Sequence, residues 1–211
     1  MDLGAGQGQL SIFLQSTHPT CKVVGVEYSA EGVRRAVEAA TATGSSAQFV
    51  QCDLLEPLDG VPSVGAGAGF AVCSEVLEHV DEPEVLIRNA SAYMAPGCRL
   101  VVTVPGGPRS ALDRHIGHRQ HFTAGELSTI LRRAGYRVER VYRAGFPTFN
   151  LYRLAVVLRG ERLIGDLAGP EADSGGRVGQ AAFRLFDSLL PWSLDDFPFG
   201  WQIAAVATFP G

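Results

Sequence analysis

Residues 1–10 read MDLGAGQGQL, in which Asp2 precedes glycines at positions 4, 6 and 8. Glycines let the backbone turn sharply and let a ligand approach the main chain closely. A helix is expected from about Gly8 to Ser16, so that its first N–H groups would point at the loop. The stretch therefore predicts a ligand-binding loop between a buried strand and a helix.

The rest of the chain alternates short apolar runs with helical patterns. Strands are predicted at 22–27, 47–53, 69–74, 98–105, 136–144 and 201–209, and helices at 30–42, 82–94, 123–135, 149–164 and 176–190. The helix at 123–135 has Thr123 as N-cap, Glu126 completing a capping box and Gly135 as stop signal. The alternation predicts a three-layer α/β fold with a mostly parallel sheet covered by helices on both faces.

The totals fit one soluble globular domain. The chain has 211 residues, of which 46% are hydrophobic and 19% charged, and we expect a single domain over 1–211 with a helical insertion at about 149–192. No apolar run reaches transmembrane length, and no secretory signal is visible. The four scattered cysteines are interpreted as buried free thiols, which fits a cytoplasmic location: Cys21, Cys52, Cys73 and Cys98.

Charge is distributed unevenly along the chain. The net charge is -4, yet residues 99–162 carry 12 basic and 4 acidic side chains. Such a block can attract an anionic substrate, nucleic acid or a membrane surface. Because its basic residues are spread over several predicted elements, we favour a solvated arginine-rich face.

The sequence of the opening loop also distinguishes between two classes of cofactor, the dinucleotides and a cofactor with a cationic amino group. Dinucleotide-binding enzymes use G-x-G-x-x-G, but Gln9 and Ser11 stand where the third glycine would be. A carboxylate at Asp2 suits a cationic amino group better than a pyrophosphate, which it would repel. Glu27, at the end of the next predicted strand, suits hydrogen bonding to a ribose diol.

The segment DLGAGQG (2–8) resembles motif I of the class I S-adenosylmethionine (SAM)-dependent methyltransferases. The resemblance implies a Rossmann-like sandwich with strand order 3-2-1-4-5-7-6 and the last strand antiparallel. It also places Tyr28 against the adenine and Asp53 near the adenine amino group. The implied cofactor-binding residues are Asp2, Gly4, Ala5, Gly6, Gly8, Glu27, Tyr28, Asp53, Leu54 and Ser74.

The strand before the loop is short. Only residues 1–3 are available for it, whereas a strand normally has about five or six residues, so the first strand is expected to be truncated. Members of the family also have N-terminal helices that help to close over the cofactor. We therefore expect the sequence to be a fragment or to begin at a misassigned internal methionine.

SEVLEHV (74–80) indicates a metal site. If a helix starts near Ser74, then Glu75, Glu78 and His79 fall on one face. The E-x-x-E-H pattern resembles that of small-RNA 3′-end 2′-O-methyltransferases and ubiquinone-pathway O-methyltransferases. This resemblance implies His118 as the later ligand, with His115 and His121 as alternatives. The set suits Mg²⁺ or Mn²⁺, with two histidines favouring Mn²⁺, Fe²⁺ or Co²⁺. Coordination would lower the pKa of an acceptor hydroxyl.

A metal-free alternative stands beside this one. L-E-H-V-like segments are widespread in methyltransferases that need no metal. In that case one histidine could be the general base, or a side chain could merely position the substrate. The catalytic candidates are His79, His118, His115 and His121.

Three functions remain open from the sequence. The first is a SAM-dependent methyltransferase that acts on a hydroxyl of a small molecule, with or without a divalent cation. The second is an RNA 2′-O-methyltransferase, against which stand the acidic total and the lack of an appended RNA-binding module. The third is a SAM-binding protein without methyl transfer. The aromatic-rich 149–192 helices are candidates for a substrate pocket or for a homodimer contact.

Overall fold

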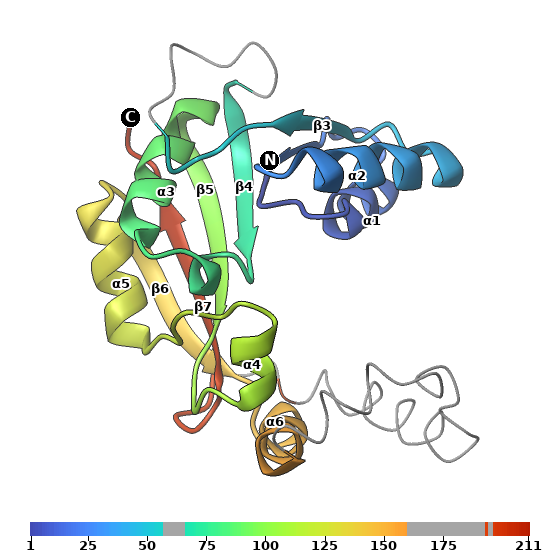
Figure 1. Cartoon of the computed structure of the whole chain (residues 1–211). Coiled ribbons are helices and arrows are strands. Elements are labelled where there is room, and N and C mark those ends of the chain that lie inside the picture. Colours follow the sequence, from blue (N-terminus) through green and yellow to red (C-terminus); the bar gives the residue numbers. More distant parts are fainter. Residues whose placement is uncertain (57–65, 160–192, 194–195) are drawn as a thin grey trace.

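The computed structural model describes residues 1–56, 66–159, 193 and 196–211. They form one seven-stranded sheet in the order β3-β2-β1-β4-β5-β7-β6 (Figure 1). The strands are β1 (Asp2–Leu3), β2 (Val24–Glu27), β3 (Gln48–Gln51), β4 (Ala68–Ser74), β5 (Met94–Pro105), β6 (Arg137–Ala144) and β7 (Gln202–Thr208). The predicted strand order is confirmed.

Strand β1 lies inside the sheet, between β2 and β4, although it has only two residues. It pairs in parallel with β2 on one side and with β4 on the other, and Leu3 lies opposite Val26 and Cys73. Strand β7 is antiparallel to both β5 and β6, while the other pairs are parallel. The ammonium group of Met1 continues the alignment by donating a hydrogen bond to the Phe70 carbonyl at 3.0 Å.

Six α-helices accompany the sheet in the described part of the chain. They are α1 (Gln9–Thr17), α2 (Ala30–Thr43), α3 (Pro83–Ala90), α4 (Ala111–His115), α5 (Ala124–Arg133) and α6 (Thr148–Arg159). Helices α1 and α2 contact each other beside β2 and β3, whereas α3 and α5 pack together on the half of the sheet that contains β6 and β7 (Figure 1). Among the described residues, no helix is long and apolar enough to cross a membrane.

Several element boundaries differ from the sequence predictions. The helix predicted at 82–94 ends at Ala90; a 3₁₀ turn follows, and β5 already begins at Met94. Helix α4 was not predicted, and α6 begins at Thr148. Its predicted continuation to 164 and the helix at 176–190 lie outside the described residues. The capping box of Thr123 and Glu126 at α5 is confirmed.

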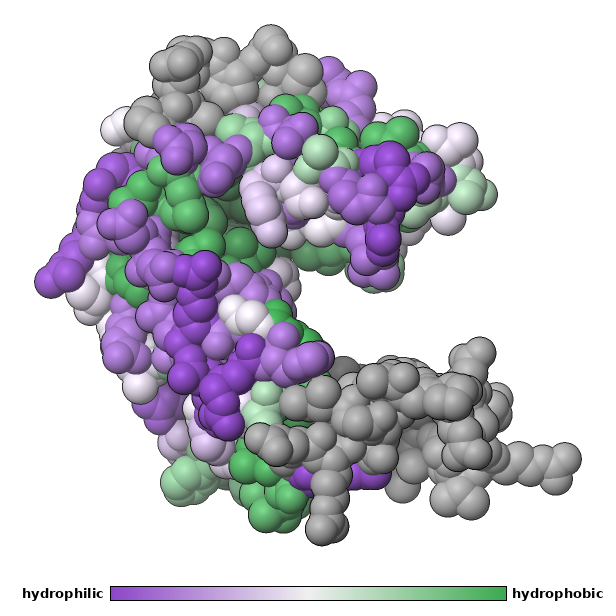
Figure 2. All heavy atoms as spheres, in the orientation of Figure 1, coloured by the Kyte–Doolittle hydropathy of each residue, from purple (hydrophilic) through white to green (hydrophobic). Residues whose placement is uncertain are grey.

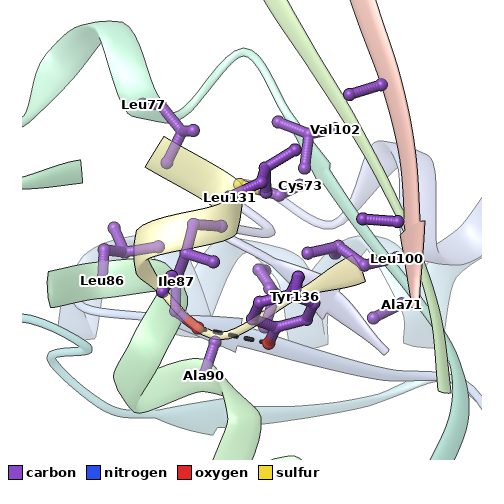
Figure 3. Close-up of a cluster of buried hydrophobic side chains, with 14 of the residues drawn as sticks. Ala71, Cys73, Leu77, Leu86, Ile87, Ala90, Leu100, Val102, Leu131 and Tyr136 are labelled. Atoms are coloured by element: carbon purple, nitrogen blue, oxygen red, sulfur yellow. Dashed lines mark hydrogen bonds between the residues drawn. The ribbon is translucent and has the colours of Figure 1, made fainter. Parts of the chain in front are cut away.

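The apolar core lies between β4, β5, β7 and the helices α3 and α5 (Figure 3). Burying each large aliphatic side chain there contributes about 1.5–3 kcal/mol. The Tyr136 hydroxyl donates to the Ile87 carbonyl at 3.2 Å, so its burial leaves no polar group unsatisfied. Of the cysteines, Cys73 and Cys98 are buried as predicted, but Cys21 is exposed and Cys52 half-buried.

Candidate functional site

A pocket of about 540 Å³ lies where adjacent parallel strands end. Gly4 follows β1, Glu27 ends β2, Asp53 follows β3, and Glu75 follows β4. Ligands of open α/β sheets bind in such a crevice, at the carboxyl ends of the strands. Figure 2 shows the surface hollowed between the part that carries α1 and α2 and the part that carries α4.

The glycine loop is held against the end of β2 by one carboxylate. Oε2 of Glu27 accepts a hydrogen bond from the Gly6 amide at 2.9 Å, and its Oε1 accepts from the Ser29 amide at 2.9 Å. Glu27 is buried and lines the pocket. Each carboxylate oxygen has a further lone pair, so Glu27 can also accept from ligand hydroxyl groups.

The loop passes close to the segment that follows β4. Gly4 has φ +72°, and a Cβ there would lie 2.5 Å from Cγ2 of Val76. Only glycine meets both demands without strain, because it has no Cβ and adopts positive φ readily. Gly4 and Val76 both line the pocket.

The predicted cofactor residues fall into two groups. Gly4, Glu27, Tyr28, Asp53 and Leu54 all line the pocket. Tyr28 is 70% exposed, so its ring is free to cover a bound ligand. Oδ1 of Asp53 accepts from the Leu55 amide at 2.9 Å, which orients this carboxylate at the pocket wall.

The other predicted cofactor-binding residues do not line this pocket: Asp2, Ala5, Gly6, Gly8 and Ser74. Asp2 is buried, and its Oδ2 accepts from the Ser11 hydroxyl at 2.7 Å. Burial raises the pKa of Asp2, against the effect of that bond. Asp2 therefore anchors α1 to β1.

The segment 74–80 is not the helix on which the metal hypothesis was built. Strand β4 runs to Ser74, Glu75 takes φ 55°, and only a 3₁₀ turn forms at Leu77–His79. Oε1 of Glu75 accepts from Gln202 Nε2 at 2.6 Å and from the Thr103 hydroxyl at 3.1 Å. Glu75 therefore does not join the group of liganding atoms around Glu78.

The three other predicted ligands do come together. Glu78, His79 and His118 each offer one atom, and these atoms lie within 4.8 Å of one another. Glu78 is fully buried, and among the described residues neither of its carboxylate oxygens has a hydrogen-bond partner. Burial, followed by the nearby Glu75 charge, raises the pKa of Glu78 to about 8. A buried carboxylate without a partner needs a proton or a cation, so this donor set fits a divalent ion.

His118 links this group to a second histidine. Its Nε2 lies 4.0 Å from Oε1 of Glu78, and its Nδ1 lies 3.2 Å from Nε2 of His121. Burial, with a further contribution from His79, lowers the pKa of His118 to about 4. The imidazole is therefore neutral at pH 7 and has a lone pair to offer.

Asp113, His118 and His121 form another close group, but Asp113 is already saturated. It accepts two hydrogen bonds from Arg153, and the amide and hydroxyl of Ser110. Burial alone would raise the pKa of Asp113, yet these bonds outweigh it and hold the pKa well below its usual range. The Arg153 charge also opposes a cation, so this group suits a metal less well.

His115 belongs to neither group and is exposed at the end of α4. The sequence analysis missed Asp113 and Arg153. The S-x-x-D pattern of Ser110 and Asp113 was the available signal, since it is a helix-capping pattern and the structure shows both of its bonds.

The fold is Rossmann-like, and its pocket lies where this fold binds ligands. A family model described as "Methyltransferase domain" matches residues 1–141, and the chain belongs to that family. The predicted enzyme class is thereby confirmed, and SAM is its methyl donor. The resemblance to the ubiquinone-pathway and small-RNA subgroups stays a prediction. No curated protein matches the chain.

Solved structures with the same fold cover nearly all of the chain. The [4+2]-cyclase SpnF has a TM-score of 0.65 at 22% identity, over 99% of this chain and 73% of that one. A SAM-dependent methyltransferase from Aquifex aeolicus has a TM-score of 0.58 at 14% identity, over 99% and 80%. Magnesium protoporphyrin IX methyltransferase from Synechocystis, with bound S-adenosylhomocysteine (SAH), has 0.54 at 16%, over 98% and 72%. These likenesses concern the fold.

Proposed function

We propose that the enzyme methylates a hydroxyl group of a small-molecule acceptor, beside the Glu78, His79 and His118 group. One observation carries this proposal: His79 belongs to that group and also lines the pocket at the strand ends. A hydroxyl held there would meet both a metal or base site and the cofactor. Methyl transfer needs this proximity because it requires the oxygen, carbon and sulfur to be in line.

Bound SAM supplies a methyl group on a positively charged sulfur. Glu27 would accept hydrogen bonds from the ribose hydroxyls, and Asp53 would accept from the adenine amino group. The exposed ring of Tyr28 would lie against the base. Support comes from the positions of the three side chains on the pocket wall.

A divalent cation is the better of the two activation schemes. A general base works best with a pKa near the working pH, whereas the pKa of His118 is about 4. A neutral imidazole of low pKa still serves as a ligand. Glu78, His79 and His118 would hold the ion, which supplies a lowered hydroxyl pKa. One oxygen and two nitrogen donors favour Mn²⁺, Fe²⁺ or Co²⁺ over Mg²⁺. His79 is the base candidate of the metal-free scheme.

A second pocket of about 420 Å³ suits the body of the acceptor. It adjoins the histidines through Gly107, whose carbonyl lies 3.2 Å from Nδ1 of His121. Its wall is rich in apolar rings: Phe122, Pro198, Phe199 and Trp201. Arg143 adds a guanidinium that donates to the Pro198 carbonyl at 2.8 Å. We infer an acceptor with an apolar or aromatic part and a negatively charged substituent.

The test is SAH release from SAM with a panel of hydroxylated aromatic acids, assayed with Mn²⁺ and with EDTA. Glu78→Gln should abolish the Mn²⁺-dependent rate, while the surface variant Glu84→Gln should keep it. Turnover that is indifferent to EDTA would rule out the cation.

Similarity in fold to a cyclase keeps a second candidate in view, a SAM-binding protein that transfers no methyl group. In that case SAM would bind, but no acceptor would yield SAH. Salt-sensitive RNA binding with SAH release on RNA would instead favour an RNA 2′-O-methyltransferase. The homodimer stays a prediction, because much of its segment lies outside the described residues.

A further inference from the structure

His121 has no part in the proposed chemistry, yet it lies between His118 and the main chain of the PGGP segment (105–108). The carbonyl of Gly107 lies 3.2 Å from Nδ1 of His121, and Nε2 of His121 lies 3.2 Å from Nδ1 of His118. These contacts form a hydrogen-bonded chain from the Gly107 carbonyl through His121 to His118, which belongs to the Glu78 group.

A carbonyl oxygen can only accept a hydrogen bond. The Gly107 carbonyl therefore determines which ring nitrogen donates and which accepts in each hydrogen bond of this chain. Nδ1 of His121 must carry hydrogen to bond to Gly107. In a neutral imidazole only one ring nitrogen carries hydrogen, so Nε2 of the neutral His121 ring is bare and can only accept. Nδ1 of His118 must therefore donate. In the neutral His118 ring, Nε2 then keeps its lone pair.

We propose that His121, anchored on the Gly107 carbonyl, is a positioning residue that holds His118 in the Nδ1–H tautomer. The bare Nε2 of His118 then faces Glu78 Oε1, 4.0 Å away. The Asp113 carboxylate lies beyond hydrogen-bonding distance of both rings, with Oδ1 3.8 Å from Nδ1 of His118 and Oδ2 3.9 Å from Nε2 of His121, so it does not set either tautomer. The liganding role that this gives to Nε2 rests on the proposed function, whereas the tautomer does not.

Gly107, whose carbonyl anchors His121, is itself held in place by the surrounding structure. Gly107 has φ +71°, and a Cβ there would lie 2.7 Å from Cγ of Trp201. A side chain at 107 would therefore meet both backbone strain and the indole ring. The neighbouring Gly106 amide donates to the Trp201 carbonyl at 2.6 Å, which ties this turn to the start of β7. Both histidine side chains are almost fully buried, at 9% and 6% exposure, so water competes little for their nitrogens.

Nitrogen NMR of the full chain, labelled at histidine and without added cation, tests the tautomer at pH 7. The wild-type spectrum should show both His118 and His121 with hydrogen on Nδ1 and a bare Nε2. His121→Phe removes the acceptor, and His118 should lose its preference for Nδ1–H. His121→Gln offers an amide oxygen in its place and should restore it. His18→Gln, on the surface, should change nothing.

The inference is overturned if wild-type His118 carries its hydrogen on Nε2, or if His121→Phe leaves the tautomer unchanged. The wild-type spectrum decides even if a variant fails to fold. Titration with Mn²⁺ alone then addresses the ligand role: losing a partner that orients a liganding histidine typically weakens metal binding about 10–100-fold, and we expect this for His121→Phe. Wild-type protein that binds no Mn²⁺ would count against the proposed cation, with the tautomer still judged by the spectrum.

Discussion

Arg153 and Asp113 form a two-pronged ion pair, with Nη1 to Oδ1 at 2.8 Å and Nη2 to Oδ2 at 2.7 Å. The pair ties α6 to α4 across 40 residues of sequence. Asp113 also closes the capping box of α4 with Ser110. His118 and His121 lie on the loop that follows α4. The Arg153–Asp113 ion pair therefore holds in place the segment that carries both histidines.

Removing Arg153 should therefore be costly. Breaking a buried pair by deleting one partner typically destabilises by about 3–5 kcal/mol, since it leaves an uncompensated buried charge. Urea denaturation of Arg153→Ala measures this. The matched control is Arg99→Ala, whose pair with Glu139 is exposed and should contribute about 0–1 kcal/mol. Equal losses in the two variants would contradict the structural role of Arg153.

Gly4→Ala should weaken SAH binding as well as the fold. A residue with a Cβ at this φ costs about 1–2 kcal/mol, and the methyl group would also press on Val76. Gly44→Ala is the control, because Gly44 has a similar φ of +67° but nothing within 4 Å of the place that a methyl group would occupy. Both variants should lose stability, and only Gly4→Ala should lose affinity in calorimetry. Unchanged affinity in Gly4→Ala would remove this loop from the cofactor site.

Stability should fall with rising pH because of Glu78. Its folded-state pKa is about 8, raised above the ordinary carboxyl value of 4.5, so the folded protein holds the proton in a range where the unfolded chain has lost it. The free energy of unfolding then drops as pH rises between these values. From pH 7.5 to 8.5, where the His118 ring is almost entirely neutral in both states, the drop should be about 0.7 kcal/mol.

Urea denaturation in EDTA at the two pH values checks this. Glu78→Gln should show a smaller drop than wild type, since its amide does not titrate. Adding Mn²⁺ should reduce the drop in wild type and leave the variant as it was. The same pH dependence in both proteins would show that Glu78 is not the titrating group.

A substitution in the second pocket should affect binding of the acceptor without affecting binding of the cofactor. Phe199 lines that pocket and is exposed within the described structure. Phe199→Ala should raise KM for an apolar acceptor, because a ring that covers it is lost, and should leave the Kd for SAH unchanged. An unaltered KM would argue that the acceptor lies elsewhere.

The strand order followed from the resemblance to the methyltransferase family, whereas the residues at the strand ends that line the pocket depend on local signals. The glycines after Asp2, and an acid at the end of each of the next two strands, mark positions that a parallel sheet brings to one edge. The prediction for Glu75 failed for a physical reason. Helical spacing was assumed after Ser74, but the chain turns there at positive φ.

Long-range contacts set the remaining features. Helix α4 depends on the Arg153 pair, whose partners are 40 residues apart, and the orientation of His118 depends on a carbonyl supplied by Gly107. The residue pattern within the segment 111–121 does not predict the contact with Arg153 or the contact with Gly107. The resemblance had already favoured His118 over His115 and His121. The fold adds that His121 contacts His118 and that His115 lies outside both groups.

The most direct test of the account is calorimetric titration with SAH. Wild-type protein should bind it, Glu27→Ala should lose that binding, and Glu31→Ala, on the exposed face of the next helix, should retain it. Circular dichroism should confirm that Glu27→Ala is folded. Binding of SAH by a folded Glu27→Ala as tight as that of wild type, or heat with NAD⁺ and none with SAH, would contradict the assignment of this pocket.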